Sequence, residues 1–228
     1  MPEAYLMLVG AALFDKLDGA LARRLGLTQP PPHREIQPRF TLGSILDDIS
    51  DGVSFCLAPA YICYVTVSSF QDPLIQGLPL VPVAWAYGIM GVARLVYFTL
   101  DRSPIPGFFK GLPTPAAGLL VSAPLILLEQ AIETGSADSA RFWGLVAFGL
   151  MVLVAVMMNL YFIRYLHMGR FMGRRPWFTR LTVLVCLVTL FTPYFGYAAL
   201  LYLSIYLLSP LFTWRVDPRD AAREGPLS

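Results

Sequence analysis

The sequence is poor in charged residues, histidine and cysteine. Only 14% of its 228 residues are Asp, Glu, Lys or Arg, and the formal net charge is +2. So small a net charge provides no basic field for a nucleic-acid partner. The three cysteines (Cys56, Cys63 and Cys186) lie within apolar runs and lack the spacing of metal ligands. We therefore expect buried free thiols, no cysteine-based metal centre and no nucleic-acid binding.

Long apolar runs make up most of the chain instead. Hydrophobic residues are 56% of the sequence, and the mean hydropathy of +0.60 is typical of an integral membrane protein. Most of the runs approach the ~20 residues that cross ~30 Å of hydrocarbon. Pro193 separates the last two, which together are too long for a single span. We predict an all-α, polytopic bundle of about seven spans, at residues 4–22, 44–70, 79–100, 115–132, 142–165, 179–192 and 194–213.

Lys and Arg residues gather in alternate loops. The segments after the first, third and fifth apolar runs are basic, whereas the loop after the second has no basic residue and the loop after the fourth has only Arg141. The positive-inside rule therefore makes the side that carries Arg23, Lys110 and Arg174 cytoplasmic. The N-terminus is then outside and the C-terminus inside.

The chain is predicted to hold one domain and a tail. Residues 1–213 form the membrane domain, in which the polar, proline-rich residues 24–42 are an extended cytoplasmic loop. Residues 214–228 form a disordered cytoplasmic tail. Only fourteen residues precede Asp15, so a helix before the present start could be missing.

Four carboxylates stand at helical spacing where the predicted spans meet the cytoplasm. Asp15 and Asp18 are three residues apart and Asp47 and Asp51 four apart, so each pair shares a helix face. Each carboxylate would cost ~2.5–3.5 kcal/mol inside the membrane unless it is compensated. A hard divalent cation such as Mg²⁺ would compensate them. Asp48 points about 100° away from Asp47 on a helix and is expected to lie at the interface or behind the metal ligands.

The residues around these carboxylates carry a family resemblance. The pattern D-x-x-D-G-x-x-A-R followed by G-x-x-x-D-x-x-x-D resembles the signature of the CDP-alcohol phosphotransferases. Its eight positions are Asp15, Asp18, Gly19, Ala22, Arg23, Gly43, Asp47 and Asp51. One departure is the segment between Arg23 and Gly43, which is longer here than is usual in the family. We interpret the surplus as the extended loop, because loops tolerate insertions.

Further runs resemble one branch of that family, the CDP-diacylglycerol–serine O-phosphatidyltransferases. They are ISDGVSFCLAPA (49–60), VARLVYF (92–98), FFKGLPTPAAG (108–118) and GRRPWF. Members usually have one more helix before the motif helix, which would give eight spans with both termini cytoplasmic. They also form homodimers, so the resemblance implies a homodimer here.

The resemblance implies a reaction and a role for each motif residue. The reaction transfers a phosphatidyl group from CDP-diacylglycerol to L-serine and releases CMP, at the cytoplasmic face of the cell (inner) membrane. Two Mg²⁺ or Mn²⁺ ions, bound by Asp15, Asp18, Asp47 and Asp51, would hold the pyrophosphate, and Asp51 would also be the base. The lipid phosphate or the serine carboxylate would contact Arg94 and Lys110. The CDP moiety would contact Asp18, Gly19, Ala22, Arg23, Gly43 and Asp47.

Several alternatives remain open at this point. The acceptor could be inositol phosphate, glycerol phosphate or choline, and the donor could carry ether-linked chains. A different class of protein, non-catalytic or a transporter with a carboxylate cation site, would also need paired acids. A transporter would more often show inverted repeats and broken helices at mid-membrane, and neither is evident in this sequence.

Overall fold

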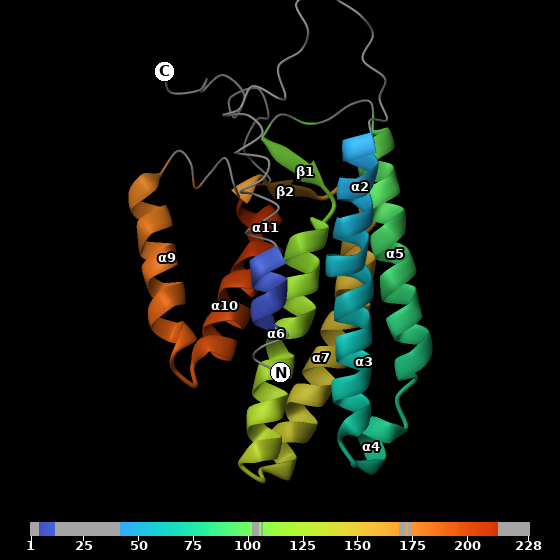
Figure 1. Ribbon diagram of the computed structural model, residues 1–228, viewed down its shortest axis with the longest axis vertical. Helices are drawn as coiled ribbons and strands as arrows, with labels where there is room; N and C mark the ends of the chain where they lie inside the picture. The colour runs from blue at the N-terminus through green and yellow to red at the C-terminus, as the bar shows by residue number, and fades with distance from the viewer. Residues whose placement is uncertain are drawn as a thin grey trace, which may run out of the picture.

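Long apolar helices lie side by side along the length of the protein (Figure 1). The computed structural model describes residues 5–11, 42–101, 105, 107–168, 172 and 175–213. Residues 5–11 are helical. The further elements are α2 (Leu42–Asp51), the π-helical segment η1 (Gly52–Leu57), α3 (Ala58–Ser69), α4 (Pro73–Gln76), α5 (Leu80–Leu100), β1 (Phe108–Lys110), α6 (Thr114–Glu133), α7 (Ala137–Met158), β2 (Arg164–Leu166), α9 (Pro176–Leu190), α10 (Phe195–Leu207) and α11 (Ser209–Thr213).

The helices confirm the prediction of a polytopic helical membrane protein. Within the described ranges, five helical segments are long and apolar enough to cross a membrane, and α9 is a shorter apolar helix. The five are Leu46–Ser69, Leu80–Leu100, Thr114–Glu133, Ala137–Met158 and Phe195–Thr213. The predicted break at Pro193 is correct, because α9 and α10 are separate helices joined by a turn. Of the predicted first span, 4–22, only residues 5–11 are described.

One predicted span ends too late. We expected a helix over 142–165, but α7 ends at Met158 and residues 164–166 form a strand. The strand pairs antiparallel with β1, so that Lys110 lies opposite Arg164. Apolar residues such as Ile163 and Tyr165 made this segment look like a continued helix, although they pack against the core from a bend and from a strand.

Helix α6 occupies the centre of the bundle. Thirteen of its residues are buried, and it contacts η1, α3, α5, α7 and α10. Because an apolar helix with neighbours on all sides needs no polar face, α6 shows no amphipathic pattern in the sequence. Residues 5–11 pack on the same helix through Tyr5, whose ring meets Phe195 of α10 edge-on at 5.6 Å.

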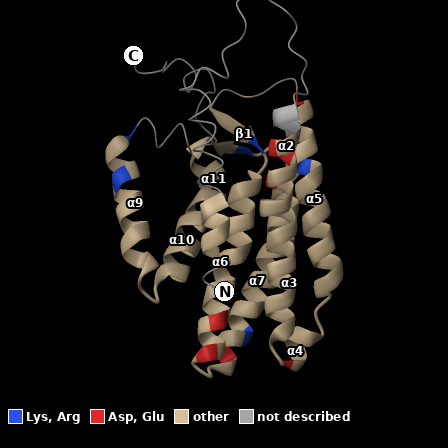
Figure 2. Ribbon diagram, viewed as in Figure 1, with Lys and Arg blue, Asp and Glu red and all other residues tan. Residues whose placement is uncertain are grey.

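Charged residues are concentrated at the two ends of the bundle (Figure 2). At one end Asp72 caps α4 by accepting hydrogen bonds from the backbone N–H groups of Leu74 and Ile75. Its other carboxylate oxygen accepts a hydrogen bond of 2.8 Å from Arg141 Nε. This hydrogen bond, with help from the backbone donors, lowers the pKa of Asp72. The opposite end carries Asp47, Asp51 and the β1–β2 sheet, and is called the site end below.

Candidate active site

The described part of the expected site is its second half. Asp15, Asp18, Gly19, Ala22 and Arg23 lie outside the described residues. Gly43 lies in the first turn of α2, and Asp47 and Asp51 follow on the same helix. Asp47 is exposed and Asp51 is half-buried.

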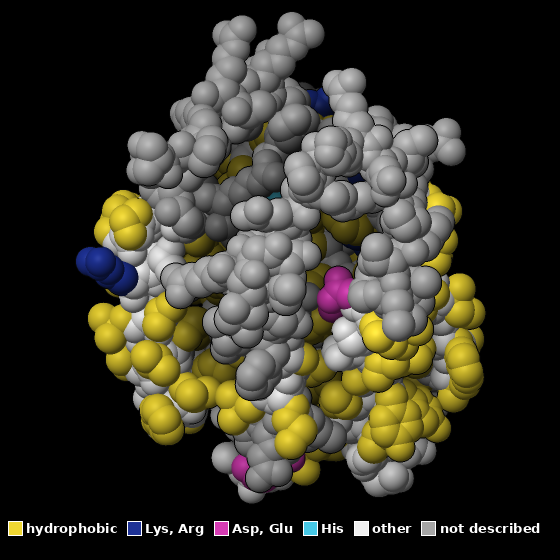
Figure 3. Space-filling model, turned by 45° about the horizontal axis from the view of Figure 1, so that its top comes forward, with side chains coloured by type: hydrophobic (Ala, Val, Ile, Leu, Met, Phe, Trp, Pro, Cys, Tyr) yellow, Lys and Arg dark blue, Asp and Glu magenta, His cyan; other side chains and the backbone are white. Residues whose placement is uncertain are grey.

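Asp47 and Asp51 are one helical turn apart and therefore lie along one face of α2. A view turned toward the site end shows acidic side chains at the surface beside a broad apolar flank (Figure 3). Oxygen donors in this setting suit Mg²⁺ or Mn²⁺. The described residues contain no group of three or more His, Cys, Asp or Glu that could hold a metal ion. The two carboxylates of α2 would thus be half of the expected ligand set, and the other half is the pair Asp15 and Asp18.

Asp48 faces a neighbouring helix. Its Oδ2 accepts a hydrogen bond of 2.9 Å from Thr99 Oγ1 on α5. Asp48 therefore ties the end of α2 to the end of α5 and does not share the face of Asp47 and Asp51.

A π-helical turn, η1, begins directly after Asp51. Such turns are rare, and they often occur at functional sites. Pro59 follows two residues after the turn and has no N–H to donate to the carbonyl of Phe55, four residues earlier. That carbonyl instead accepts a hydrogen bond of 3.0 Å from the buried hydroxyl of Tyr87 on α5.

Two glycines let neighbouring helices approach the π turn closely. A Cβ atom on Gly91 of α5 would lie 2.6 Å from the sulfur of Cys56. A Cβ atom on Gly118 of α6 would lie 3.0 Å from the carbonyl oxygen of Phe55. Both distances are shorter than ordinary carbon contacts, so the turn is enclosed on two sides by helix backbones.

Arg94 is buried in α5 and points its guanidinium toward the site end. The residue is 3% exposed, its Nε donates to the carbonyl oxygen of Leu112 at 3.2 Å, and its guanidinium carbon lies 5.0 Å from the centre of the Phe98 ring. No residue in the described part of the chain accepts a hydrogen bond from its two Nη atoms. A buried arginine with an unused donor pair is well suited to bind an anionic group.

Lys110 lies at the same end but is already paired. Its Nζ atom is 2.8 Å from Asp101 Oδ2, and both side chains are mostly buried. The turn after Lys110 depends on Gly111, which has a φ of +73° and donates its N–H to the Ile163 carbonyl at 2.9 Å. The structure thus holds Lys110, the last residue of β1, against the end of α5.

A polar cluster at the end of α7 was missed in the sequence. Asn159 donates through Nδ2 to the Met90 carbonyl at 3.0 Å and accepts at Oδ1 a hydrogen bond of 2.7 Å from Tyr161. The Tyr161 ring stacks on Tyr97 of α5, with 3.6 Å between the ring centres. Burial raises the pKa of Tyr161, so its hydroxyl stays protonated. Only the position of Asn159 at the end of an apolar run signals this cluster.

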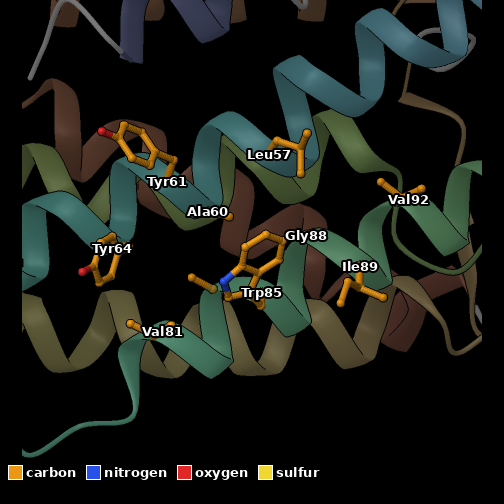
Figure 4. Close-up of a pocket in the computed structure, with 10 residues that line it drawn as sticks. Leu57, Ala60, Tyr61, Tyr64, Val81, Trp85, Gly88, Ile89 and Val92 are labelled. Carbon is orange, nitrogen blue, oxygen red and sulfur yellow. The ribbon is translucent and has the colours of Figure 1, made fainter.

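An apolar groove in the described part of the chain is lined by residues of η1, α3 and α5, none of them charged (Figure 4). Its volume is ≈ 560 Å³, and it opens between α3 and α5. Its lining is almost entirely apolar, with Leu57 and Val92 toward the site end and Tyr64 and Val81 toward the opposite end. Since it offers no charged group to a phosphate, we do not assign it to the chemistry.

Comparisons with known proteins agree with the motif. A model of the CDP-alcohol phosphatidyltransferase family matches residues 2–209. The chain is 32% identical over 140 residues to a CDP-diacylglycerol–serine O-phosphatidyltransferase of Mycobacterium leprae (strain TN), covering 57% of this chain and 40% of that protein. It is 31% identical over 117 residues to the enzyme of the same name from Bacillus subtilis (strain 168), covering 51% and 56%. It is 29% identical over 180 residues to a phosphatidylcholine synthase of Mesorhizobium japonicum (strain LMG 29417 / CECT 9101 / MAFF 303099), covering 78% and 56%. The chain thus spans about half the length of these relatives.

Proposed function

Because this chain belongs to the CDP-alcohol phosphatidyltransferase family, we propose that it transfers the phosphatidyl group of CDP-diacylglycerol to the hydroxyl of L-serine and releases CMP. The observation that carries the proposal is that the Asp47–Asp51 face and the unused donors of Arg94 lie at the same end of the bundle. The serine enzymes among its relatives support the choice of acceptor.

In this reaction Asp51 takes the proton from the serine hydroxyl. The serine oxygen then bonds to the phosphorus next to the diacylglycerol, and the bond from that phosphorus to the leaving CMP oxygen breaks. Asp15, Asp18, Asp47 and Asp51 would bind two Mg²⁺ or Mn²⁺ ions, which neutralise phosphate charge in reactions of this type. Asp18, Gly19, Ala22, Arg23, Gly43 and Asp47 would contact the CDP moiety.

Arg94 is the better of the two expected anion contacts. Its planar guanidinium can form two parallel hydrogen bonds to a carboxylate or a phosphate. Lys110 is engaged by Asp101, and its ammonium group lacks the planar fork of a guanidinium. We assign Arg94 to the serine carboxylate or to the donor phosphate, two oxyanions that a kinetic comparison distinguishes.

The site end would face the cytoplasm of a cell (inner) membrane. Lys110, Arg164 and Arg175 lie at or near this end, whereas the opposite end carries Glu129, Glu133 and Asp138. This asymmetry supports the orientation that the positive-inside rule predicts. The bilayer, CDP-diacylglycerol and L-serine are then the partners, and a homodimer is expected from the family resemblance.

Choline is the second acceptor to consider, since the relative that covers the largest part of this chain among the three is a phosphatidylcholine synthase. Arg94 favours serine over choline if it binds the acceptor and not the donor phosphate. A quaternary ammonium group gains nothing from a guanidinium, whereas the carboxylate of serine can accept both of its Nη donors.

An acceptor panel tests the proposal. The full chain in lipid–detergent micelles is supplied with CDP-diacylglycerol, Mg²⁺ or Mn²⁺, and one of L-serine, choline, glycerol phosphate or inositol phosphate. We expect release of CMP and formation of phosphatidylserine with L-serine. Release with a different acceptor alone would overturn the choice of serine. No release with any of the four would overturn the proposed reaction, and a parallel series with an ether-linked donor tests the lipid chains.

A further inference from the structure

We infer that Tyr87 is a positioning residue, whose hydroxyl holds the π turn through the Phe55 carbonyl and so sets the direction in which α2 presents Asp47 and Asp51. The inference rests on the proposed function for its kinetic readout, but its structural readout is independent of turnover. Tyr87 lies in α5, outside the acidic motif, and the hydrogen bond of its hydroxyl is to the Phe55 carbonyl.

The first step is that the Phe55 carbonyl needs an outside donor. In an ordinary helix the N–H four residues later would bond to it, and here that residue is Pro59. A buried carbonyl without a partner costs free energy comparable to a lost hydrogen bond. The Tyr87 hydroxyl fills this role at 3.0 Å, and the Tyr87 side chain is fully buried.

The second step is that the turn governs α2. The π segment contacts both α5 and α6, with Gly91 and Gly118 allowing the close approach. Beyond it, α2 is tied to α5 by the bond from Thr99 to Asp48. A π turn holds one more residue than an α turn, so its presence rotates everything before it by about 100° relative to an unbroken helix. Whether this turn persists therefore decides which way Asp47 and Asp51 face.

The third step concerns the reaction. Carboxylates that act on one phosphate from two different helices must be held to within a fraction of an ångström. A change in the rotation of α2 would separate Asp47 and Asp51 from the other half of the set. The expected result is a loss in kcat and a higher requirement for divalent metal, with little change in the KM for serine.

The test is Tyr87→Phe, which keeps the ring and removes only the hydroxyl. We expect kcat to fall about ten-fold, the factor that one hydrogen bond of about 1.4 kcal/mol represents. Half-maximal activity should need more Mn²⁺. The matched control is Tyr64→Phe on α3, whose hydroxyl has no hydrogen bond in the described part of the chain and whose ring lines the apolar groove. Its kcat should equal that of the wild type.

A rescue separates positioning from a general loss of stability. In Tyr87→Phe with Pro59→Ala, residue 59 regains an N–H that can serve the Phe55 carbonyl. We expect the double variant to recover most of the lost kcat. An equal loss in the single and double variants would overturn the assignment of Phe55 as the link.

Spin-label distances supply the readout that needs no activity. Labels at Leu46 on α2 and Val96 on α5, both exposed, report the direction of α2 across the turn. A Cys186→Ser background removes the exposed cysteine. We expect Tyr87→Phe to shift or broaden this distance distribution. An unchanged distribution would overturn the inference even if kcat fell.

The control pair lies on the other side of the turn. Labels at Tyr61 on α3 and Ile89 on α5 are also exposed, and their distance should be the same with and without the Tyr87 hydroxyl. A wild-type chain that releases no CMP would refute the proposed function and leave the distance experiment intact. A wild-type kcat in Tyr87→Phe, with an active wild type, would refute the inference alone.

Discussion

Replacement of Gly111 by alanine should disable the site end more than it destabilises the fold. Gly111 has a φ of +73°, and a Cβ atom there would lie far inside van der Waals contact of the Met158 carbonyl oxygen. The left-handed backbone alone costs an alanine about 1–2 kcal/mol. Relieving the clash requires a backbone shift, because the contact is with the end of α7 and not with a flexible side chain. Such overpacking typically adds about 1–3 kcal/mol.

A backbone shift that relieves the clash would displace the residues expected to bind the anion. Gly111 is followed by Leu112, whose carbonyl accepts the hydrogen bond from Arg94 Nε, and is preceded by Lys110. A shift of this turn therefore moves both expected anion contacts. We expect CMP release by Gly111→Ala to fall at least ten-fold at a fixed, subsaturating serine concentration.

Gly135→Ala is the matched control. Gly135 also has a positive φ, of 70°, but no atom lies within 4 Å of a Cβ atom placed there, and it follows α6 at the opposite end. The free energy of unfolding of Gly135→Ala should fall only by the about 1–2 kcal/mol that a left-handed backbone costs an alanine, and the variant should keep its activity. Thermal unfolding in detergent and CMP release are measured for both variants. Activity in Gly111→Ala equal to that in Gly135→Ala would refute the reasoning.

Three further predictions concern single charged side chains. Asp51→Asn should abolish CMP release but retain CDP-diacylglycerol binding, and full activity of this variant would remove the base assignment. The control Asp48→Asn can still accept the Thr99 hydrogen bond and should stay active. Arg94→Gln should raise KM about 10- to 100-fold for the substrate whose anion Arg94 binds, because a charged hydrogen bond of about 1.5–3 kcal/mol is lost. A variant whose KM for serine and KM for CDP-diacylglycerol both equal the wild-type values would contradict this assignment. The lowered pKa of Asp72 means that its ionised form stabilises the fold above the unfolded pKa of about 3.9. The difference in Tm between the wild type and Asp72→Asn, measured at pH 7, should therefore shrink as the pH falls below about 4. A difference that stays constant would show that the charge of Asp72 is not the source of the stabilisation.

The sequence was sufficient for the helices because the membrane imposes one rule on each of them. A span must be apolar over its whole length, so length and hydropathy alone located α5 and α6 to within a residue or two. The break between α9 and α10 followed from Pro193 and from the total length. What hydropathy cannot detect is a change of backbone within an apolar run, and for this reason both the π turn and strand β2 went unnoticed.

The candidate site shows the same division. Carboxylates in a membrane protein are conspicuous, and helical spacing was enough to group Asp47 with Asp51 and to set Asp48 apart. Arg94 was also recognisable as a candidate site residue, since a charged side chain inside a membrane span requires a partner. Tyr87 and Asn159 were not, because each acts through a backbone carbonyl of another helix, and such a partner has no sequence signature.

Helix α9 gives the protein a part that responds to bilayer thickness. It has 15 residues and a length of about 22 Å, shorter than the ~30 Å of an average hydrocarbon core, and it contains no buried residue. A short helix without core packing adapts to thicker lipid by thinning the bilayer around it or through flanking side chains that reach to the interface. A thicker membrane would thus perturb the α9–α10 hairpin first, whereas η1 and α2 are held by α5 and α6. Lipid chain length could then vary widely before the spacing of the carboxylates changes.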